Sequence, residues 1–252
     1  MIWRLALKVF YRNFLVWKRY YWMSFVEAVG EPILYFVAIG FGLGAVIGEI
    51  DGRPYIEFLS PALIATSIMF GSSLETTYGS FTRLKIEKVF QSIAVTPVSL
   101  REVIAGEILW GASKGLVSGI VMLLVVGSMG LVHSWMAIGV IPLLVLEALF
   151  FSSLGMMMTA YARDYSVFVV YITLGLESMF LFSGTFFPLS SLPAWAQGLA
   201  WSLPLTPIVS MARGLFDGAP PWSSAIGLLG IAAATALLVA GSMAKISRRL
   251  ID

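Results

Sequence analysis

Six stretches of this chain are long and apolar enough to cross a lipid bilayer. A helix needs about 20 mostly apolar residues to span a hydrocarbon core of about 30 Å. The runs cover residues 25–46, 58–78, 103–126, 136–161, 166–187 and 223–244. We therefore expect an all-α integral membrane protein with six transmembrane helices, in which residues 1–252 form a single transmembrane domain.

The composition supports a membrane protein and excludes several kinds of chemistry. Apolar residues make up 59% of the chain and charged residues 12%, whereas a soluble domain has about 25% charged residues. The absence of Cys and the presence of one His, His133, exclude disulfides, thiol catalysis and Cys or His metal clusters. The chain has no G-x-x-x-x-G-K-[ST] phosphate loop, so we expect no ATP hydrolysis by that route and no cofactor in this chain.

Lys and Arg are distributed unequally between the two sides of these runs. Arg53 and Arg213 fall on one side, and Lys114 lies within the third run. The other side holds Arg4, Lys8, Arg12, Lys18, Arg19, Arg83, Lys85, Lys88, Arg101, Arg163, Lys245, Arg248 and Arg249. Because cytoplasmic connections carry the excess of positive charge, both termini are predicted to be cytoplasmic. An even number of spans agrees with this orientation.

Residues 2–22 are predicted to form an amphipathic helix in the membrane interface. Its aromatic and apolar residues recur at spacings of three and four, which places them on one stripe. A basic arc lies beside this stripe, a pattern typical of helices that lie flat among lipid headgroups. An ordinary soluble helix packed on another element is the alternative. The candidate interfacial residues are Arg4, Lys8, Arg12, Trp17, Lys18 and Arg19.

Residues 79–102 form the only sizeable cytoplasmic connection between the runs. Phe81, Leu84, Lys85 and Lys88 have helical spacing, and Thr96-Pro97 ends the pattern. A short exposed amphipathic helix is a natural docking element for a partner. A solvated connector held near the membrane by its charges explains the pattern equally well, so the residues alone leave both interpretations open.

Ionisable residues inside the apolar runs are a second functional signal. Lys114, Glu147 and Glu177 each lie about eleven residues from a run end, a depth of about 16 Å. Such residues cost about 3 kcal/mol unless they are paired or hydrated. We expect Lys114 to pair with Glu147, because their runs are consecutive and antiparallel. A polar pathway or relay, and an ion pair that fixes helix register, are both open interpretations. Further intramembrane or pathway candidates are Glu27, Glu31, Glu75 and Glu107.

Residues 188–221 are apolar but interrupted by prolines, including Pro188, Pro193, Pro204 and Pro207. The segment is too broken for a span and too apolar for a solvated loop. We expect one or two short helices that dip into the outer half of the membrane, where they must be buried in protein or line a cavity. Four tryptophans suit an outer aromatic belt, with stacking on sugars as the alternative: Trp135, Trp195, Trp201 and Trp222.

The chain resembles the permease subunits of the type-2 family of ABC exporters. The matching stretches occur in order along nearly the whole chain and are fairly specific together, although each is weak alone. They are residues 31–35 (EPILY), 40–44, 55–59 (YIEFL), 75–78 (ETTY) with Phe81, Thr96-Pro97, Gly106-Glu107 with Trp110 and Lys114, 182–188 (FSGTFFP), Leu192-Pro193 and Pro204-Leu205. Family members often have Asp before the first proline, so Glu31 is a variant that keeps the charge.

The resemblance implies six membrane helices, an interfacial N-terminal helix and short re-entrant helices between the fifth and sixth spans. It also implies a homodimer of permeases with two copies of a separate ABC-type ATP-binding subunit, which binds ATP and magnesium. The other expected partner is membrane lipid, and nucleic acid is not expected. The residues implied to couple to the ATPase are Phe81, Arg83, Leu84, Lys85, Glu87, Lys88, Thr96 and Pro97.

The resemblance further implies a bacterial plasma (inner) membrane protein that exports an amphiphile, which is a lipo-oligosaccharide, a lipid-linked glycan or a hydrophobic drug. The cargo would enter from the cytoplasm or inner leaflet and leave through the re-entrant segment. The candidate outer gate comprises Phe186, Phe187, Pro188 and Trp195. A proton-coupled secondary transporter using Glu107, Lys114, Glu147 and Glu177 is the alternative function. An integral-membrane enzyme has no supporting metal cluster, thiol or Ser/His pair.

Overall fold

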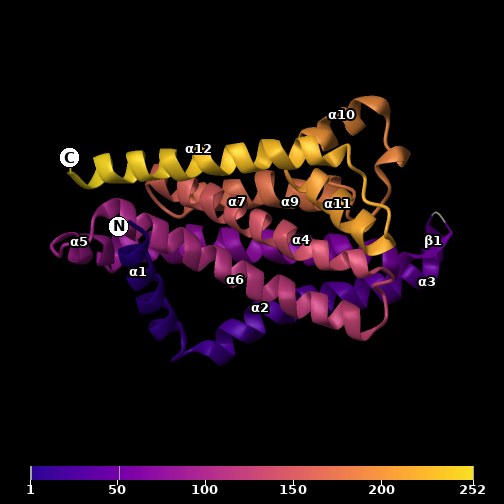
Figure 1. Cartoon of the computed structure of the whole chain (residues 1–252), viewed down its shortest axis with the longest axis horizontal. Helices are drawn as coiled ribbons and strands as arrows, with labels where there is room; N and C mark the ends of the chain where they lie inside the picture. The colour runs from indigo at the N-terminus through magenta and orange to yellow at the C-terminus, as the bar shows by residue number, and fades with distance from the viewer. Residues whose placement is uncertain (1, 51, 252) are drawn as a thin grey trace.

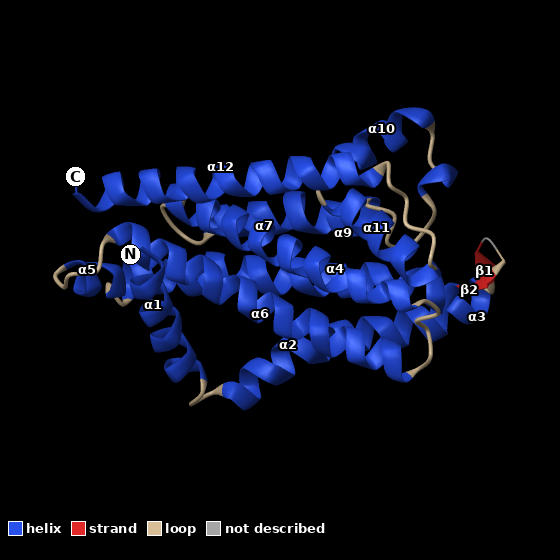
Figure 2. Cartoon of the chain, viewed as in Figure 1, coloured by secondary structure: helices blue, strands red, loops and turns tan. Residues whose placement is uncertain are grey.

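The computed structural model describes residues 2–50 and 52–251. Within its helices, the side chains of residues 2–3, 24–25, 27–29, 31 and 250–251 lie outside the description, so the candidates Glu27 and Glu31 are not placed. The described chain is almost entirely helical, as predicted, with one short β-hairpin (Figure 2). Both termini and α5 lie at one end of an elongated bundle, and the hairpin lies at the other (Figure 1).

Among the described residues, four helices are long and apolar enough to cross a membrane. They are Tyr55–Ile86, Leu100–Ser128, Trp135–Tyr161 and Ser224–Arg249. Two shorter apolar helices, Pro32–Ile47 and Ser166–Phe182, correspond to the first and fifth predicted runs. A multi-pass membrane protein is therefore indicated, while crossing by the two shorter helices stays a prediction.

The four long helices are built from α-helical and π- or 3-10-helical segments. The segments are α4 (Tyr55–Leu74), η2 (Glu75–Gly79) and η3 (Thr82–Ile86), then α6 (Leu100–Ser128), then η4 (Trp135–Gly139) and α7 (Val140–Tyr161), and finally α12 (Ser224–Ile251).

The remaining elements precede, connect or follow these helices. They are α1 (Ile2–Trp17), α2 (Tyr21–Tyr35), η1 (Phe36–Leu43), α3 (Gly44–Ile47), β1 (Glu49–Ile50), β2 (Arg53–Pro54), α5 (Val89–Ala94), α8 (Ser166–Val170), η5 (Tyr171–Leu176), α9 (Glu177–Phe182), η6 (Leu189–Ser191), α10 (Ala194–Ser202) and α11 (Leu205–Asp217).

Helix α4 occupies the centre of the bundle, packed between α6 and α7. Its close contact with α6 depends on glycines spaced four residues apart on α6. A Cβ atom at Gly115 would lie 2.0 Å from Ser72 Oγ, and one at Gly119 would lie 2.3 Å from Ile68 Cγ1. On the other side, a Cβ atom at Gly155 of α7 would lie 2.3 Å from Thr76 Oγ1. Small residues let membrane helices approach closely, so these glycines set the spacing of the core.

The helix that begins at Tyr55 continues beyond the predicted end of its run at residue 78. It extends through two π-helical segments to Ile86, and Phe81 and Leu84 near its end are buried rather than solvated. Phe81 packs with Phe168, while Leu84 belongs to a separate apolar cluster that includes Phe90. These tertiary contacts extend the helix, and α5 with the loops around it projects from this end of the bundle, where the C-terminal end of α12 also lies (Figure 1).

Helix α1 ends at Trp17 rather than continuing to residue 22 as predicted. Its apolar side packs on α6, where a Cβ atom at Gly106 would lie 2.7 Å from the Ala6 carbonyl oxygen. Val9 is buried in the same contact. The chain then turns before α2, so α1 and α2 meet at an angle beside the bundle (Figure 1).

The proline-interrupted segment folds into the short helices η6, α10 and α11, in agreement with the prediction of short helices there. Helix α11 buries Leu205, Ile208 and Val209 against the bundle. It ends at Asp217 and is followed by Gly218, whose φ of +73° is readily available only to glycine. Whether α10 and α11 enter the membrane stays a prediction.

Candidate functional site

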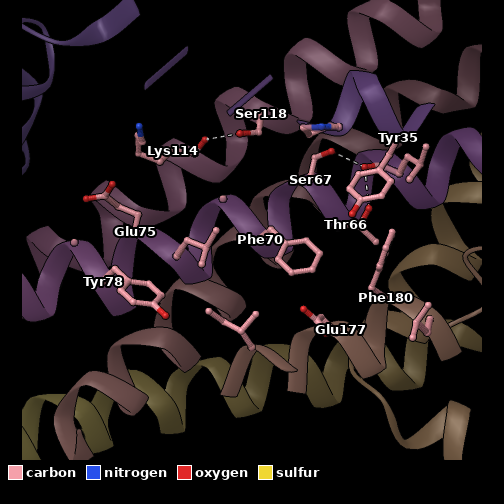
Figure 3. A pocket seen from close by; sticks show the side chains of 17 residues that line it. Tyr35, Thr66, Ser67, Phe70, Glu75, Tyr78, Lys114, Ser118, Glu177 and Phe180 are labelled. Atoms are coloured by element: carbon pink, nitrogen blue, oxygen red, sulfur yellow. Dashed lines mark hydrogen bonds between the residues drawn. The ribbon is translucent and has the colours of Figure 1, made fainter. Parts of the chain in front are cut away.

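A cavity of about 740 Å³ lies between α2, α4, α6 and the helix Ser166–Phe182 (Figure 3). We call it the central cavity. Its walls are largely apolar and include Leu63, Phe70 and Phe180. Three charged residues also line it, namely Glu75, Lys114 and Glu177. Its volume falls within the range of about 300–1,000 Å³ that is usual for ligand sites.

Two of the π-helical segments contribute to the cavity walls. Glu75, Tyr78 and Gly79 come from η2, and Ile172 comes from η5. A π-helical turn holds an extra residue in the helix and often occurs at a functional site. Here, η2 turns the Glu75 carboxylate toward the neighbouring helix α6.

Lys114 and Glu177 lie on opposite sides of α4 (Figure 3). Lys114 is the middle residue of α6 and is therefore about 21 Å along the axis from either helix end. Its ammonium nitrogen lies 5.8 Å from the centroid of the Trp17 ring. Glu177 begins α9 and is exposed on the surface of the single chain. The cavity is therefore lined by two charges on different walls, of which Glu177 is exposed.

The predicted pair between Lys114 and Glu147 is not formed. Glu147 is completely buried in α7, and neither of its carboxylate oxygens has a hydrogen-bond partner among the described residues. Lys114 instead faces Trp17 at the end of α1. A common depth along two helices does not fix the direction in which each side chain points, which is why the prediction was wrong.

At the end of the bundle that carries the termini, the charged residues that pair are Glu75, Arg83 and Glu107. Arg83 Nη2 lies 2.8 Å from Glu75 Oε1 and 2.7 Å from Glu107 Oε2, and Arg83 Nε donates to Glu107 Oε2 at 2.8 Å. The Glu107 side chain is 0% exposed, and that of Arg83 is 16% exposed. The guanidinium thus joins α6 to two turns of the long helix that begins at Tyr55. We call these three residues and their hydrogen-bond partners the Arg83 network.

Three neutral side chains complete the Arg83 network. Asn13 Nδ2 donates to Glu107 Oε1 at 2.7 Å, and Ser80 Oγ donates to Glu107 Oε2 at 2.8 Å. Trp110 Nε1 donates to Glu75 Oε1 at 2.9 Å. Asn13 brings α1 into the network, so three separate segments meet at two carboxylates. Buried charges require such partners, because a carboxylate without them pays a large desolvation cost.

Glycine at position 79 makes the placement of Glu75 possible. A Cβ atom there would lie 2.8 Å from Glu75 Oε1 and 3.3 Å from Arg83 Nη2. Glu75 belongs both to the Arg83 network and to the wall of the central cavity. The Arg83 network therefore reaches the wall of the central cavity at Glu75.

The network contains residues that our sequence analysis did not select. Asn13 and Ser80 carry no charge, and the predictions for their segments used only the spacing of apolar and charged residues. Ala6, Val9 and Asn13 are spaced three and four residues apart and form the buried side of α1. This spacing indicates the buried side of α1, but the prediction followed the aromatic stripe instead. Trp110 was indicated only by the family resemblance.

The predicted coupling residues fall into two groups. Phe81 and Leu84 are buried, and Arg83 is engaged with Glu75 and Glu107, so these three do not present their side chains to a partner. The exposed group lies in residues 85–99, which we call the tip, and comprises Lys85, Glu87, Lys88, Thr96 and Pro97. Two exposed apolar side chains, Ile86 and Val95, lie among them.

The tip also contacts the turn between α7 and α8. Lys85 Nζ donates to the Arg163 carbonyl oxygen. At the same turn, the Ser166 hydroxyl and backbone N–H donate to the Asp164 carboxylate, and these bonds lower the pKa of Asp164. Tyr165 adds a hydroxyl contact of 2.8 Å with Thr82. The tip is thus anchored to the start of the helix that carries Glu177.

The remaining candidates are placed as follows. Arg4, Lys8, Lys18 and Arg19 are exposed on or just after α1, whereas Arg12 is partly buried and donates to Asn13 Oδ1 at 3.0 Å. Phe186, Phe187 and Pro188 are partly buried, and Trp195 is exposed on α10. The interfacial and gate roles of these residues stay predictions.

An aromatic cluster borders the central cavity toward the β-hairpin. The Phe180 ring contacts Phe70 and Phe186, with centroid distances of 5.9 and 4.8 Å, and Tyr35 also packs on it at 5.7 Å. The Phe186 carbonyl accepts a hydrogen bond of 3.1 Å from the Tyr55 hydroxyl. We call these five residues the aromatic partition.

The long apolar helices and the cavity among them define a polytopic membrane protein with an internal site. Residues 5–216 match the family described as ABC-2 type transporter, and the chain belongs to this family. The family provides the membrane-spanning permease subunit of ABC transporters, and its ATPase is a separate subunit.

Curated relatives agree with this assignment. The chain is 36% identical over 205 residues to "Nodulation protein J" of Sinorhizobium fredii (strain NBRC 101917 / NGR234), covering 81% of this chain and 78% of the relative. It is 34% identical over 212 residues to the protein of the same name in Rhizobium meliloti (strain 1021), covering 84% and 81%. "Inner membrane transport permease YadH" of Escherichia coli (strain K12) is 30% identical over 201 residues, covering 77% and 75%.

Proposed function

We propose that this chain is the membrane-spanning subunit of an ATP-driven exporter that moves an amphiphilic molecule out of the cytoplasm or the inner leaflet of a bacterial plasma membrane. The observation that carries this proposal is the position of Glu75. Its carboxylate lines the central cavity and accepts hydrogen bonds from Arg83 and Trp110. Arg83 lies two residues from the exposed tip.

The tip is the docking surface for the ATP-binding subunit. It combines the cations Lys85 and Lys88 with the exposed apolar side chains of Ile86 and Val95. Apolar groups surrounded by charges are typical of protein contacts that exclude water at their centre. Lys88 has a φ of +54°, an uncommon conformation for a residue other than glycine. This backbone directs the chain from the end of η3 into α5.

Movement of the tip reaches the cavity through a short, continuous path. The helix from Tyr55 to Ile86 carries the tip at one end, Arg83 one turn earlier and Glu75 two turns before Arg83. ATP binding shifts a permease only when its conformational states contact the ATPase differently. Closure of the ATPase displaces the tip, and the Arg83 network transmits this displacement to α6 and the cavity wall.

The cavity lining suits an amphiphile. Leu63, Phe70 and Phe180 accommodate a hydrophobic chain, while the charged residues Lys114 and Glu177 accommodate a polar group. An uncharged lipo-oligosaccharide, a lipid-linked glycan and a hydrophobic drug all have this division into apolar and polar parts. The N-terminal helix α1, at the side of the bundle, provides the route of entry from the inner leaflet.

A second copy of this chain completes the site. Glu177 is exposed on a helix that we place within the membrane, where a charge facing lipid costs about 3 kcal/mol. A twofold partner covers this carboxylate and closes the open side of the central cavity. Both termini and the tip lie at one end of the bundle, which we place in the cytoplasm because most Lys and Arg also lie there. Family membership does not favour proton-coupled secondary transport.

Purification from native membranes in mild detergent tests the assembly. We expect an ATP-binding subunit to accompany the chain in equal amount. Replacement of both Lys85 and Lys88 by Glu should lower the recovery of that subunit, and should reduce cargo-stimulated ATP hydrolysis at least about tenfold, the effect of about 1.4 kcal/mol. Lys245→Glu, an exposed change near the same end of the bundle, is the matched control. Equal recovery and equal stimulation in all variants would refute the docking surface.

A further inference from the structure

A second cavity, of about 400 Å³, lies at the end of the bundle opposite the termini. The start of α4, the 183–189 segment and α11 form most of its walls. We call it the hairpin pocket because the β1–β2 hairpin forms its rim with Ile50 and Arg53. The functional assignment of the central cavity does not use it.

The charged groups of the hairpin pocket balance one another. Arg53 and Asp217 form an ion pair across its rim. Arg213 donates to the Phe58 carbonyl at 3.0 Å and to the Gly184 carbonyl at 2.9 Å. Glu57 is the fourth charged lining residue. Two cations and two carboxylates give a lining without net charge that still offers both donors and acceptors.

Ser183 supplies a polar group whose bonding capacity is not used. Ser183 is one of the residues that line the hairpin pocket, it is 1% exposed, and its hydroxyl has no hydrogen-bond partner among the described residues. A buried hydroxyl left without a partner costs about 1–3 kcal/mol. An occupant of the pocket that accepts or donates a hydrogen bond removes this cost.

Trp201 provides an aromatic wall in the same pocket. About half of its side-chain surface is exposed, so one part of the ring is available for contact. Aromatic rings combine a large apolar contact area with a specific geometry. A ligand with an apolar face and several hydroxyl groups matches this wall and the donors and acceptors around it. A purely apolar ligand would leave the polar groups without partners, and an ion would leave an unbalanced charge.

The hairpin pocket lies directly beyond the aromatic partition. Phe180 lines the central cavity and contacts Phe186, whose carbonyl is bound by Tyr55, and Tyr55 stacks on Phe58 at 6.4 Å. Phe58 in turn lines the hairpin pocket. The two cavities are thus separated by a few aromatic side chains.

We propose that the hairpin pocket binds the uncharged, hydroxyl-rich headgroup of the exported amphiphile, a sugar unit in chemical class, after it passes the aromatic partition. This inference rests on the proposed export function. Ser183 forms a hydrogen bond to a headgroup hydroxyl, Trp201 packs against the face of the ring, and Asp217 and Glu57 accept from further hydroxyls.

Binding of octyl glycosides to the purified complex tests this inference. The probes are octyl glucoside, octyl maltoside and octyl N-acetylglucosaminide, each below its critical micelle concentration. Octyl sulfate and octyltrimethylammonium carry the same chain with a charged headgroup. Saturation-transfer NMR should show contact with the sugar protons of at least one glycoside, at an affinity about tenfold or more above that of both charged probes. The absence of any such preference would overturn the proposal.

Two pairs of variants locate the binding site. Thr185 is buried and without a partner, as Ser183 is, but it does not line the pocket. Ser183→Ala should weaken glycoside binding about fivefold or more without lowering stability, because the hydroxyl has no partner to lose. Thr185→Val should leave binding unchanged. Similarly, Trp201→Ala should abolish saturation of the sugar ring protons, while Trp222→Ala, an exposed residue outside the pocket, should not.

The variants also separate this inference from the export function. Recovery of the ATP-binding subunit is measured in the same Ser183→Ala preparation. Thr185→Val, a change outside the pocket, should keep both this recovery and basal ATP hydrolysis at the wild-type level. Unchanged glycoside binding in both Ser183→Ala and Trp201→Ala would overturn the hairpin pocket as the site while leaving the exporter assignment intact. Failure to recover any ATPase with the wild-type chain would instead refute the proposed function.

Discussion

Replacement of Arg83 is the most direct test of how the end of the bundle that carries the termini is held together. Arg83→Gln removes the cation that lies within 2.8 Å of both Glu75 and Glu107. Glu107 would keep only Asn13 and Ser80 as donors while remaining completely buried. Removing one partner of a buried ion pair costs about 3–5 kcal/mol, because the remaining charge stays desolvated. The Arg83 and Glu107 side chains are 16% and 0% exposed, so solvent offers little compensation.

The expected loss is large enough to measure by thermal unfolding in detergent. For a chain of this size, 1 kcal/mol corresponds to about 2–4 °C in Tm, so Arg83→Gln should lower Tm by about 10 °C. Intrinsic tryptophan fluorescence can follow the transition, because the chain has 8 Trp residues. Arg101→Gln, an exposed change at the start of α6, should shift Tm by less than about 2 °C.

A double variant distinguishes the ionic contribution from general disruption. Arg83→Gln combined with Glu107→Gln removes the buried charge together with its partner, and should recover at least about half of the lost stability. Two results would refute the reasoning. One is a wild-type Tm for Arg83→Gln, and the other is a double variant that is less stable than Arg83→Gln alone.

Two further predictions test the core spacing and the backbone of the tip. Gly115→Ala should destabilise the chain by about 1–3 kcal/mol, because the added methyl group would clash with Ser72 and the Ile68 carbonyl. Gly127→Ala in the same helix should be neutral or stabilising. Equal Tm values for the two variants would contradict the close α4–α6 contact. Lys88→Gly should stabilise the tip by about 1 kcal/mol by removing the cost of its positive φ, and Lys88→Val should destabilise it. Hydrogen exchange of residues 89–94 measures both effects, and faster exchange in the glycine variant would contradict the expectation.

Much of the architecture was predictable because the requirement for a helix in lipid applies to each segment of the chain separately. An apolar run of about 20 residues is sufficient to predict a helix, since every backbone polar group in lipid must be bonded within its own segment. The second, third, fourth and sixth runs correspond to the four long helices. The interruption of residues 188–221 by proline likewise predicted short helices there, and α10 and α11 are found in this segment.

The direction of side chains around each helix was not predictable in the same way. Lys114 and Glu147 share a depth along neighbouring helices, yet Lys114 points toward Trp17 and Glu147 is enclosed by other residues. Arg83 has the charge and position of a docking residue in the sequence, but the continuation of its helix to Ile86 turns it toward Glu75 and Glu107. The rotation of a helix about its own axis depends on packing against neighbouring helices, so no local sequence pattern predicts it.

Apolar length and motif order are properties of the linear chain, so they were enough to indicate a helical membrane protein of the ABC-2 family. Which charges meet and where cavities form depends instead on how the helices pack against one another. Glu75 and Arg83 lie eight residues apart, but Glu107 and Asn13 reach them from other helices. The hairpin pocket gathers residues from position 50 to position 217. Such sites depend on distances between helices, which glycines such as Gly115 set through contacts far apart in sequence.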